Sequence, residues 1–353
     1  MSNSKFTLGV VFGGLSREHN VSIKSAQTIT KALKIGENIN KFKIICIYID
    51  TEGRWWGSEV ATKALEKGIA LKGNELPLQN PTKGFNQLPP GFEKVDIWYP
   101  VLHGPNGEDG SIQGLFKLTR KPFVGSGVLG SSLGMDKIAM KAAFTAAGLP
   151  QALYQSANAS EINNQSSIQV LLKRLEKTIG YPCFIKPANL GSSVGISKAS
   201  DREQLIQGLK LAAKFDQRIV IEENIIAREL ECAVLGKNPL KTSLIGEIQH
   251  NSDWYDYEAK YSSKKSTAII PALLSDNISN QIYKLSLAAC KAISVEGIAR
   301  IDFFYNEIKN EVLINEVNTL PGFTSQSMYP LLWAASGLNL EKLVAEIVKT
   351  ARE

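Results

Sequence analysis

Four polar side chains near the end of the chain alternate along two apolar runs. Arg300 and Asp302 are two residues apart in the first run, and Glu316 and Asn318 are two residues apart in the second. Because alternate residues of a strand point to the same face, a hairpin of these runs would gather the four side chains on one patch. Oxygen donors of this kind suit Mg²⁺ held against phosphate oxygens. The alternative is two edge strands with charged solvent faces, but the apolar neighbours weigh against it, since unpaired buried charges are costly.

A second candidate site lies in the middle of the chain, where the strand-like run YPCFIKP contains Lys186. The small and flexible residues 191–195 follow it. A lysine beside such a loop can surround phosphates with charge and backbone donors, although many strands end in lysine and many loops contain glycine. Further on, residues 220–224 followed by Glu229 resemble a linker between two lobes. Its backbone could contact an adenine edge, and Glu229 could hold the ribose hydroxyls.

Two glycine-rich turns invite a nucleotide-binding interpretation. One of them matches the dinucleotide pattern G-x-G-x-x-G through Gly125, Gly127 and Gly130. No acidic residue follows ~20 positions later to hold a ribose, so a turn leading into a helix at 135–147 is the preferred interpretation. The other turn, Gly13-Gly14, separates the first strand from the first helix, where backbone N–H groups can face an anion or a small molecule. The sequence contains no G-x-x-x-x-G-K-[ST] phosphate loop.

The elements that must position these residues begin with a strand–helix–strand pattern. Short β-rich runs occupy 6–12, 42–50 and 95–104, and apolar residues at helical spacing begin at Val21. This alternation is typical of a parallel α/β layer. Residues 53–94, rich in Gly, Pro, Asn and Lys, are expected to form a surface excursion with little core of its own.

The rest of the chain divides into two further groups of elements. The strong helix formers at 135–150 open the first group, and the polar residues 155–167 are expected to form a loop. In the second group, a helix near 277–294 precedes the two alternating strands, and a helix at 338–350 closes the chain. No internal repeat or low-complexity segment interrupts this order.

Size and composition limit the classes of protein to which the chain can belong. A single core stops growing at ~250–300 residues, so 353 residues predict two or three domains. An apolar fraction of 44% and a charged fraction of 21% are ordinary for a folded soluble protein. The net charge of +6 is modest, and no long Lys/Arg run or zinc-finger spacing occurs, so nucleic acid is not expected as a partner.

Cysteine usage and hydropathy indicate a cytoplasmic protein. The four cysteines lie far apart among apolar neighbours and show no CxxC spacing, as expected of reduced core residues. No run of ~18 apolar residues occurs, and the N-terminus lacks a signal-peptide pattern, so no membrane association is expected.

Eight strings, spread in order over most of the chain, resemble the D-alanine–D-alanine ligases of the ATP-grasp superfamily. They are GGLSREHNVS (13–22), HGPNGEDG (103–110), GMDK (134–137), FIKPANLGSSVGIS (184–197), VIEENIIARELECAVLG (220–236), YDYEAKY (255–261), GIARIDFF (297–304) and NEVNTLPGFTSQSMYP (315–330). Eight blocks in one order are far more specific than any single motif. The resemblance is weakest in 53–94 and 155–167.

The resemblance implies an α/β fold in which a parallel α/β domain precedes a two-lobed ATP grasp. The expected units are 1–131 for substrate binding, 132–222 for the central lobe and 223–353 for the C-terminal lobe with the metal site. It also implies a reaction in which one D-alanine carboxylate is phosphorylated by ATP and is then attacked by the amine of a second D-alanine. Phosphorylation is needed because a carboxylate is a poor electrophile. The dipeptide would supply bacterial peptidoglycan.

The resemblance further implies which residues bind the substrates, ATP and metal. The substrate-binding residues would be Glu18, His103, Lys260, Ser327 and Met328. The ATP-binding residues would be Lys137, Lys186, Ser192, Ser193, Glu222, Glu229 and Lys260, with the backbone of Glu223 and Ile225. Two Mg²⁺ (or Mn²⁺) ions would be held by Asp302, Glu316 and Asn318.

The implied catalytic groups surround the reacting carbonyl. Arg300 and the backbone N–H of Gly322 would stabilise the oxyanion of the tetrahedral intermediate. Residues 250–267 would form a lid, and Tyr261 on it would bond towards Ser192 and Glu18, keeping water from the acyl phosphate. The identity of Tyr261 and the apolar Met328 after Ser327 favour D-alanine as the acceptor, with some use of D-serine expected.

Other functions stay open at this point. A related ATP-grasp ligase could use D-lactate or D-serine as its acceptor. A non-catalytic ATP-binding sensor could keep the same fold, although the apparently complete set of motif residues weighs against it. A dehydrogenase would have to bind NAD. The resemblance also implies a homodimer.

Overall fold

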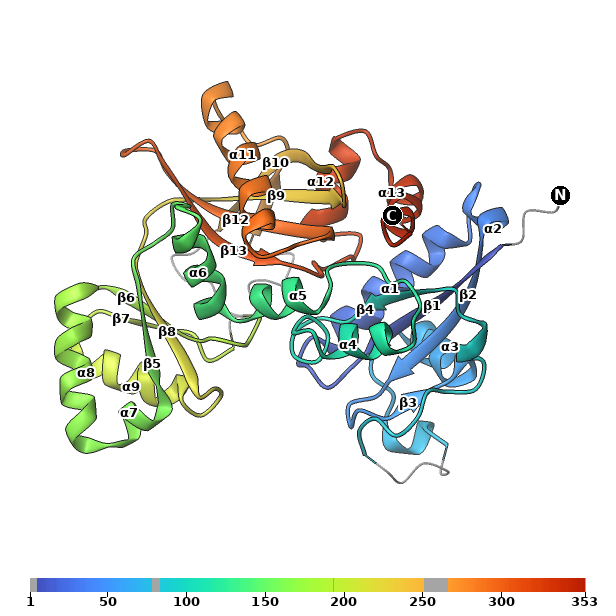
Figure 1. Ribbon diagram of the computed structural model, residues 1–353, viewed down its shortest axis with the longest axis horizontal. Helices are drawn as coiled ribbons and strands as arrows, with labels where there is room; N and C mark the ends of the chain where they lie inside the picture. Colours follow the sequence, from blue (N-terminus) through green and yellow to red (C-terminus); the bar gives the residue numbers. More distant parts are fainter. Residues whose placement is uncertain (1–4, 78–82, 193, 251–265, 353) are drawn as a thin grey trace.

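The computed structural model describes residues 5–77, 83–192, 194–250 and 266–352. Three sheets organise these residues, and Figure 1 shows them as three groups of elements from blue through green to red. In this described part, no helix is both long enough and apolar enough to cross a membrane.

The first sheet has the strand order β3-β2-β1-β4, and β1 pairs in parallel with β2 and β4. Its strands are β1 (Phe6–Gly13), β2 (Phe42–Ile49), β3 (Trp55–Trp56) and β4 (Ile97–Val101). The accompanying helices are α1 (His19–Leu33), α2 (Asn38–Lys41), α3 (Ser58–Lys67) and α4 (Ser111–Leu118), with short 3₁₀ turns η1 (Gly73–Glu75) and η2 (Phe92–Lys94). The predicted parallel layer and the glycine turn between β1 and α1 are therefore confirmed.

The prediction of little core in 53–94 was wrong. Helix α3 packs on β2 and buries Val60, Ala61 and Ala64. These three residues lie at i, i+1 and i+4, which is one face of a helix. The Gly- and Pro-rich composition that suggested an excursion belongs mainly to the residues after α3.

The second sheet is antiparallel, with the order β5-β8-β6-β7. Its strands are β5 (Tyr154–Asn158), β6 (Cys183–Pro187), β7 (Ser197–Ala199) and β8 (Arg218–Glu223), and its helices are α7 (Ala159–Asn163), α8 (Gln165–Thr178) and α9 (Arg202–Ala212). The predicted loop at 155–167 was therefore wrong. Its polar residues include caps: the Asn164 side chain accepts bonds from the N–H groups of Ser166 and Ser167, both at 3.0 Å.

Two consecutive helices connect the first sheet to the second. They are α5 (Val128–Met135) and α6 (Lys137–Ala146). The predicted helix is α6, but the expected turn before it is confined to residues around Gly125, which has φ +94°, because helix α5 already begins at Val128. Asp136 separates the two helices by accepting a 2.8 Å bond from the N–H of Ala139.

The third sheet is also antiparallel, in the order β11-β10-β9-β12-β13. Its strands are β9 (Arg228–Gly236), β10 (Leu240–His250), β11 (Ser266–Ile269), β12 (Gly297–Asn306) and β13 (Glu311–Asn318). Helix α11 (Asp276–Ala292) packs on it, and α12 (Met328–Ala335) and α13 (Leu340–Thr350) follow. The predicted hairpin of the two alternating strands is confirmed as β12–β13.

The end of the chain packs against its beginning. Helix α13, red in Figure 1, contacts α1. Ile29 of α1 and Leu343 and Ile347 of α13 belong to one buried apolar cluster. This shared core ties the third sheet to the first, so that loops from both can meet at one site.

Candidate functional site

The β12–β13 hairpin brings the four alternating polar residues together. In its register Arg300 lies opposite Asn318, and Asp302 lies opposite Glu316. The prediction that these residues share a patch is therefore confirmed at the level of the backbone. A register shift directly after Asp302 ends the regular pairing at this point of the hairpin.

Ion pairs organise these side chains into what we call the hairpin cluster: Glu231, Arg300, Asp302, Glu316 and Asn318. The Arg300 guanidinium grips Asp302 through Nε–Oδ1 and Nη2–Oδ2 bonds, both 2.7 Å long. Its Nε also lies 2.9 Å from Oε2 of Glu231 on the neighbouring strand β9. Burial lowers the pKa of Arg300, but the charges of Asp302 and Glu231 outweigh it and raise that pKa well above its usual value.

The donor set of the hairpin cluster suits a hard cation. Asp302 and Glu316 face each other across the hairpin, and Asn318 Nδ2 donates a 3.0 Å bond to Asp302 Oδ2, which leaves its amide oxygen as a further oxygen donor. In the described part of the chain, no three Asp, Glu, His or Cys side chains gather as a complete metal site. A cation here would therefore need the amide of Asn318 and oxygens from a ligand as well.

A second group of charges, the lysine cluster, comprises Lys141, Lys186 and Glu222. Both Glu222 oxygens are paired, Oε1 with Lys141 Nζ at 2.7 Å and Oε2 with Lys186 Nζ at 2.5 Å. Burial raises the pKa of Glu222, but the two lysines outweigh it and hold that pKa well below its usual range. The side chain predicted to contact adenine is thus the counter-ion of two lysines.

The two clusters act on each other electrostatically. Burial lowers the pKa of Lys186, but the charges of Glu222, Glu316 and Glu229 outweigh it and raise that pKa above its ordinary value. Lys137 lies between the clusters, with Nζ 3.8 Å from Glu316 Oε2 and bonded at 2.8 Å to the carbonyl of Leu190. The predicted phosphate-binding lysines and the predicted metal ligands therefore belong to one site.

The loop after β6 and the β8–β9 connection complete this side. Ser192 is buried and has φ +54°, a conformation that L residues adopt rarely. Glu223 accepts a 2.7 Å bond from the N–H of Leu153 through Oε1, and its own N–H donates to the Leu153 carbonyl at 3.0 Å. Ile225 is half-buried in the connection, and Glu229 lies at the start of β9.

Glu18 lies where the loops of the first and second sheets meet. A Cβ built on Gly104 would lie 3.2 Å from Glu18 Oε2, and one built on Gly191 would lie at the same distance. The Glu18 carboxylate is therefore next to both the loop after β4 and the loop after β6. A side chain at either position would be in tight contact with the carboxylate, so the two glycines leave it uncrowded.

His103 and Glu108 lie on the loop after β4 and contact the residues after β13. His103 Nδ1 is 2.9 Å from the Leu320 carbonyl, and its Nε2 is 3.2 Å from Ser25 Oγ. Glu108 accepts bonds from the N–H groups of Gly104 at 2.7 Å and Leu320 at 3.1 Å. Burial, with the Glu18 charge adding to it, raises the pKa of Glu108 to about 8, and burial lowers the pKa of His103.

Gly322 and Ser327 lie close together in the loop between β13 and α12. A Cβ on Gly322 would come within 3.1 Å of Ser327 Oγ, which also bonds Thr324 through the backbone N–H at 3.0 Å and Oγ1 at 2.8 Å. Met328 is buried, and its Cε fills the space beside Gly246 on β10. Three other predicted residues, Ser193, Lys260 and Tyr261, lie outside the described residues. Most of the predicted lid at 250–267 lies outside them as well.

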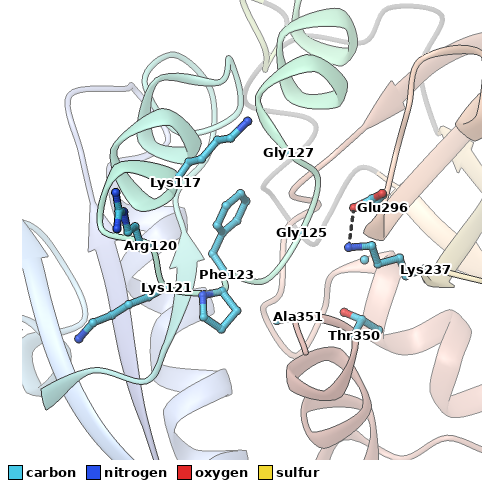
Figure 2. Close-up of a pocket in the computed structure, with 12 residues that line it drawn as sticks. Lys117, Arg120, Lys121, Phe123, Gly125, Gly127, Lys237, Glu296, Thr350 and Ala351 are labelled. Carbon is cyan, nitrogen blue, oxygen red and sulfur yellow. Dashed lines mark ion pairs between the residues drawn. The ribbon is translucent and has the colours of Figure 1, made fainter. Parts of the chain in front are cut away.

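A pocket of about 320 Å³ lies elsewhere, between the end of α4 and the end of α13 (Figure 2). Two of its cations bond other protein groups: Lys237 pairs with Glu296 at 3.2 Å, and Lys121 Nζ donates to the Glu93 carbonyl at 2.7 Å. Among the described residues that line it, none is a predicted site residue. The chemistry suggested by the sequence is therefore carried by the charged clusters and not by this pocket.

Several residues of the site were not predicted from the sequence. Lys141 is one helical turn after Lys137 on α6, and this spacing could have identified it. Glu231 lies opposite Asp302 on β9, a pairing that no local pattern indicates. Glu108 lies within the motif HGPNGEDG, but the motif by itself did not indicate a role for it.

Two family models match the chain. The model described as D-ala D-ala ligase N-terminus matches residues 7–126, and the one described as D-ala D-ala ligase C-terminus matches residues 143–349. A D-alanine--D-alanine ligase of Prochlorococcus marinus is 58% identical over 351 residues, which cover 99% of this chain and 100% of the relative.

Solved structures give the same result. The VanG D-Ala:D-Ser ligase from Enterococcus faecalis matches with a TM-score of 0.82 and 30% identity, covering 99% of this chain and 100% of the other. The D-alanine-D-alanine ligase from Coxiella burnetii matches with a TM-score of 0.78 and 32% identity, covering 98% of this chain and 94% of the other.

Proposed function

The chain belongs to the D-alanine–D-alanine ligase family, and from that premise we propose how its residues join two D-alanines. It is an ATP-grasp enzyme that makes D-alanyl-D-alanine for peptidoglycan synthesis, with ADP and phosphate as the other products. The first D-alanine is activated as an acyl phosphate, and the amine of the second displaces the phosphate through a tetrahedral intermediate.

The observation that supports these roles best is the pair of facing charge clusters. Lys137 and Lys186 would offer ammonium groups to the ATP phosphates, while Lys141 is buried and holds Glu222 in place. The hairpin cluster offers Asp302, Glu316 and Asn318 as ligands for two Mg²⁺ (or Mn²⁺) ions, which would offset charge on the transferred phosphoryl group. An acidic group and a basic group side by side suit a metal-bound polyphosphate.

The backbone between the second and third sheets would hold the rest of ATP. Glu223 and Ile225 would contact the adenine through their backbone groups, Glu222 would stand beside it, and Glu229 would bind the ribose. Ser192 and Ser193, in the loop after β6, would cover the phosphates. This assignment agrees with the ion pair between Glu222 and Lys186 and with the charge of Glu229, which acts on Lys186.

D-alanine would bind on the opposite side of the phosphates. Glu18, beside Gly104 and Gly191, would pair with the ammonium of the first D-alanine. Ser327 and Lys260 would hold the carboxylate of the second. Arg300 and the Gly322 N–H would stabilise the oxyanion between them, and Tyr261 on the lid would help exclude water.

The units 1–131, 132–222 and 223–353 are proposed as the functional divisions of the chain. We also propose that the enzyme is cytoplasmic, where ATP and D-alanine are available, and that it is a homodimer as its resemblance to the family implies. Light scattering of the purified protein would test the dimer directly. A monomer at all concentrations would contradict it.

The decisive experiment measures phosphate release from ATP and Mg²⁺ with D-alanine, with L-alanine, with D-alanine plus D-lactate or D-serine, and without an acceptor. Release that requires D-alanine and yields the dipeptide is expected. Release that requires D-lactate or D-serine would keep the chemistry and change the specificity, a possibility kept open by the D-Ala:D-Ser ligase among the similar structures. ATP binding without release would contradict an enzymatic role.

A further inference from the structure

Residues 320–323, which carry Gly322, are held by side chains from the other end of the chain. Leu320 bonds through both of its peptide groups: its N–H donates to Glu108 Oε1 at 3.1 Å, and its carbonyl accepts from His103 Nδ1 at 2.9 Å. Three residues on, the N–H of Phe323 donates to Ser25 Oγ at 3.1 Å. Gly322 therefore lies between two fixed points.

From this geometry we propose that Ser25, His103 and Glu108 form a loop clamp that positions the Gly322 N–H for the tetrahedral intermediate. The inference rests on the proposed function, because it concerns the oxyanion donor of that reaction. None of the three acts on the reacting atoms in this role. They are positioning residues that act through the backbone of 320–323.

One arrangement of protons satisfies the hydrogen bonds of His103 and Ser25. The Leu320 carbonyl can only accept, so His103 carries its proton on Nδ1 and donates it there. His103 Nε2 then accepts from the hydroxyl of Ser25 at 3.2 Å. The same hydroxyl oxygen accepts the N–H of Phe323. A neutral imidazole is needed, which agrees with the burial that lowers the pKa of His103.

The clamp also joins the oxyanion donor to the ammonium pocket. The second oxygen of Glu108, Oε2, accepts the N–H of Gly104 at 2.7 Å. Gly104 is one of the two glycines that flank the Glu18 carboxylate. One side chain thus sets the distance between the loop beside the first D-alanine and the loop beside the reacting carbonyl.

This restraint has consequences for the rate. An N–H stabilises an oxyanion only when it is directed at the developing charge from about 2.7–3.1 Å. Gly322 has no Cβ to restrict its backbone, so its direction has to come from neighbours. Loosening the clamp should therefore weaken transition-state stabilisation while ATP binding, which uses other loops, stays intact.

Two substitutions and two matched controls test the clamp. Glu108→Gln replaces one accepting oxygen by an N–H₂ group, and Ser25→Ala removes the hydroxyl. Asp109→Asn is the control for the first, because Asp109 also accepts two backbone bonds, from Asn106 at 2.8 Å and Ser111 at 2.9 Å, but within its own loop.

The control for the second is Ser22→Ala. Ser22 lies one turn earlier on α1, is equally buried, and bonds Gly13 N at 2.7 Å and the Val101 carbonyl, all within the first sheet and its helix. Ser22→Ala therefore removes a hydroxyl of the same kind from a residue that does not bond residues 320–323.

The expected result is a kcat on the order of 10–100-fold lower for Glu108→Gln and ~10-fold lower for Ser25→Ala, with the KM for ATP within ~2-fold of the wild type. The kcat of the double variant should fall by less than the product of the two single fold-changes, because both side chains act through one loop. A phosphinate analogue of the dipeptide, a tetrahedral mimic tested with ATP, should bind more weakly by a similar factor. The two controls should stay within ~3-fold of the wild type in kcat.

Equal losses in the variants and their controls would overturn the clamp, as would a rise in the KM for ATP that matches the fall in kcat. Melting temperatures of all six proteins identify any variant that fails to fold. If one of the two single clamp variants does not fold, the other single variant still tests the proposal. A wild-type protein that makes no dipeptide would overturn the proposed function instead. The two failures are therefore distinguishable.

Discussion

The hairpin cluster and the lysine cluster both consist of buried and half-buried charges, but they differ in the numbers of acidic and basic groups. The hairpin cluster sets three carboxylates against the single guanidinium of Arg300. The lysine cluster sets two ammonium groups against the single carboxylate of Glu222. Counted over their own members, the hairpin cluster is therefore rich in acids and the lysine cluster is rich in bases, and Lys137 pairs with Glu316 from outside both.

This difference shows how the protein can bind a metal and a polyphosphate side by side. A balanced buried ion pair has little to offer a ligand, because its charges already satisfy each other. In a cluster with unequal numbers of acidic and basic side chains, the ion pairs keep the side chains charged. Such a cluster can still attract a ligand ion of the opposite sign. The raised pKa of Lys186 and the lowered pKa of Glu222 both indicate that these charges persist at neutral pH.

The largest expected effect comes from removing the only cation of the hairpin cluster. Arg300→Ala should lower kcat by on the order of 10³-fold and weaken ATP binding far less, because the guanidinium acts on the transition state. Phosphate release at saturating substrates and the Kd for ATP measure the two effects. Arg228→Ala is the matched control, since Arg228 lies on the same sheet and pairs with Glu247 at 2.6 Å and Glu307 at 2.7 Å. Near-normal turnover of Arg300→Ala would contradict the assignment.

Removing the only anion of the lysine cluster should act on stability. Glu222→Gln removes the carboxylate that pairs with both ammonium groups, and Lys141 is only 1% exposed. The free energy of unfolding should fall by about 3 kcal/mol, as measured by urea denaturation. Glu223→Gln should change it by less than about 1 kcal/mol, because Glu223 accepts a backbone bond that the amide oxygen can also accept. Equal losses for both would show that Glu222 has no special role.

Acid should reduce the difference between wild type and Glu222→Gln. The folded-state pKa of Glu222 lies below the unfolded value, so its contribution is complete above about pH 4.5 and is lost as the pH falls towards the folded value. The unfolding free energy of the wild type should therefore fall more steeply, by up to ~1.4 kcal/mol per pH unit. Urea titrations between about pH 3 and pH 5 measure this slope. Parallel slopes for Glu222→Gln and wild type would contradict this prediction.

The smallest effect concerns the lysine between the clusters. Lys137 is 3.8 Å from Glu316, so Lys137→Gln should cost less than ~1 kcal/mol of stability yet raise the KM for ATP by about 10-fold. Lys141→Gln, one helical turn away, should do the reverse and affect stability more than KM. Steady-state kinetics and thermal melting of the two variants make the comparison. Equal changes in KM and in stability for the two variants would contradict the separate roles assigned to the two lysines.

Much of the secondary structure was predictable because apolar periodicity is local. The strands around Val10, Ile47 and Ile301 and the helix around Ile29 all follow from it. The errors at 53–94 and 155–167 arose where polar residues obscured it. Asn164, for example, favoured a loop in the sequence, and in the structure it caps α8.

The candidate site was predictable in part for the same reason. Alternation and the predicted hairpin placed Asp302 and Glu316 on one patch. The strand and the loop after it indicated Lys186, and the family resemblance added Lys137. The partners of these residues were not predictable. Lys141 joins Glu222 across 81 positions of sequence, and Glu108 reaches Leu320 across 212.

The sequence by itself therefore determined most of the elements, the family and the chemical types of the site residues, because these depend on local spacing and on motifs. The tertiary structure alone decided which charges pair with each other and which side chains hold the backbone around Gly322. The physical reason is that ion pairs and hydrogen bonds act over a few ångströms in space. Only the packing of α13 on α1, and of the three sheets around one site, brings those distant residues within reach.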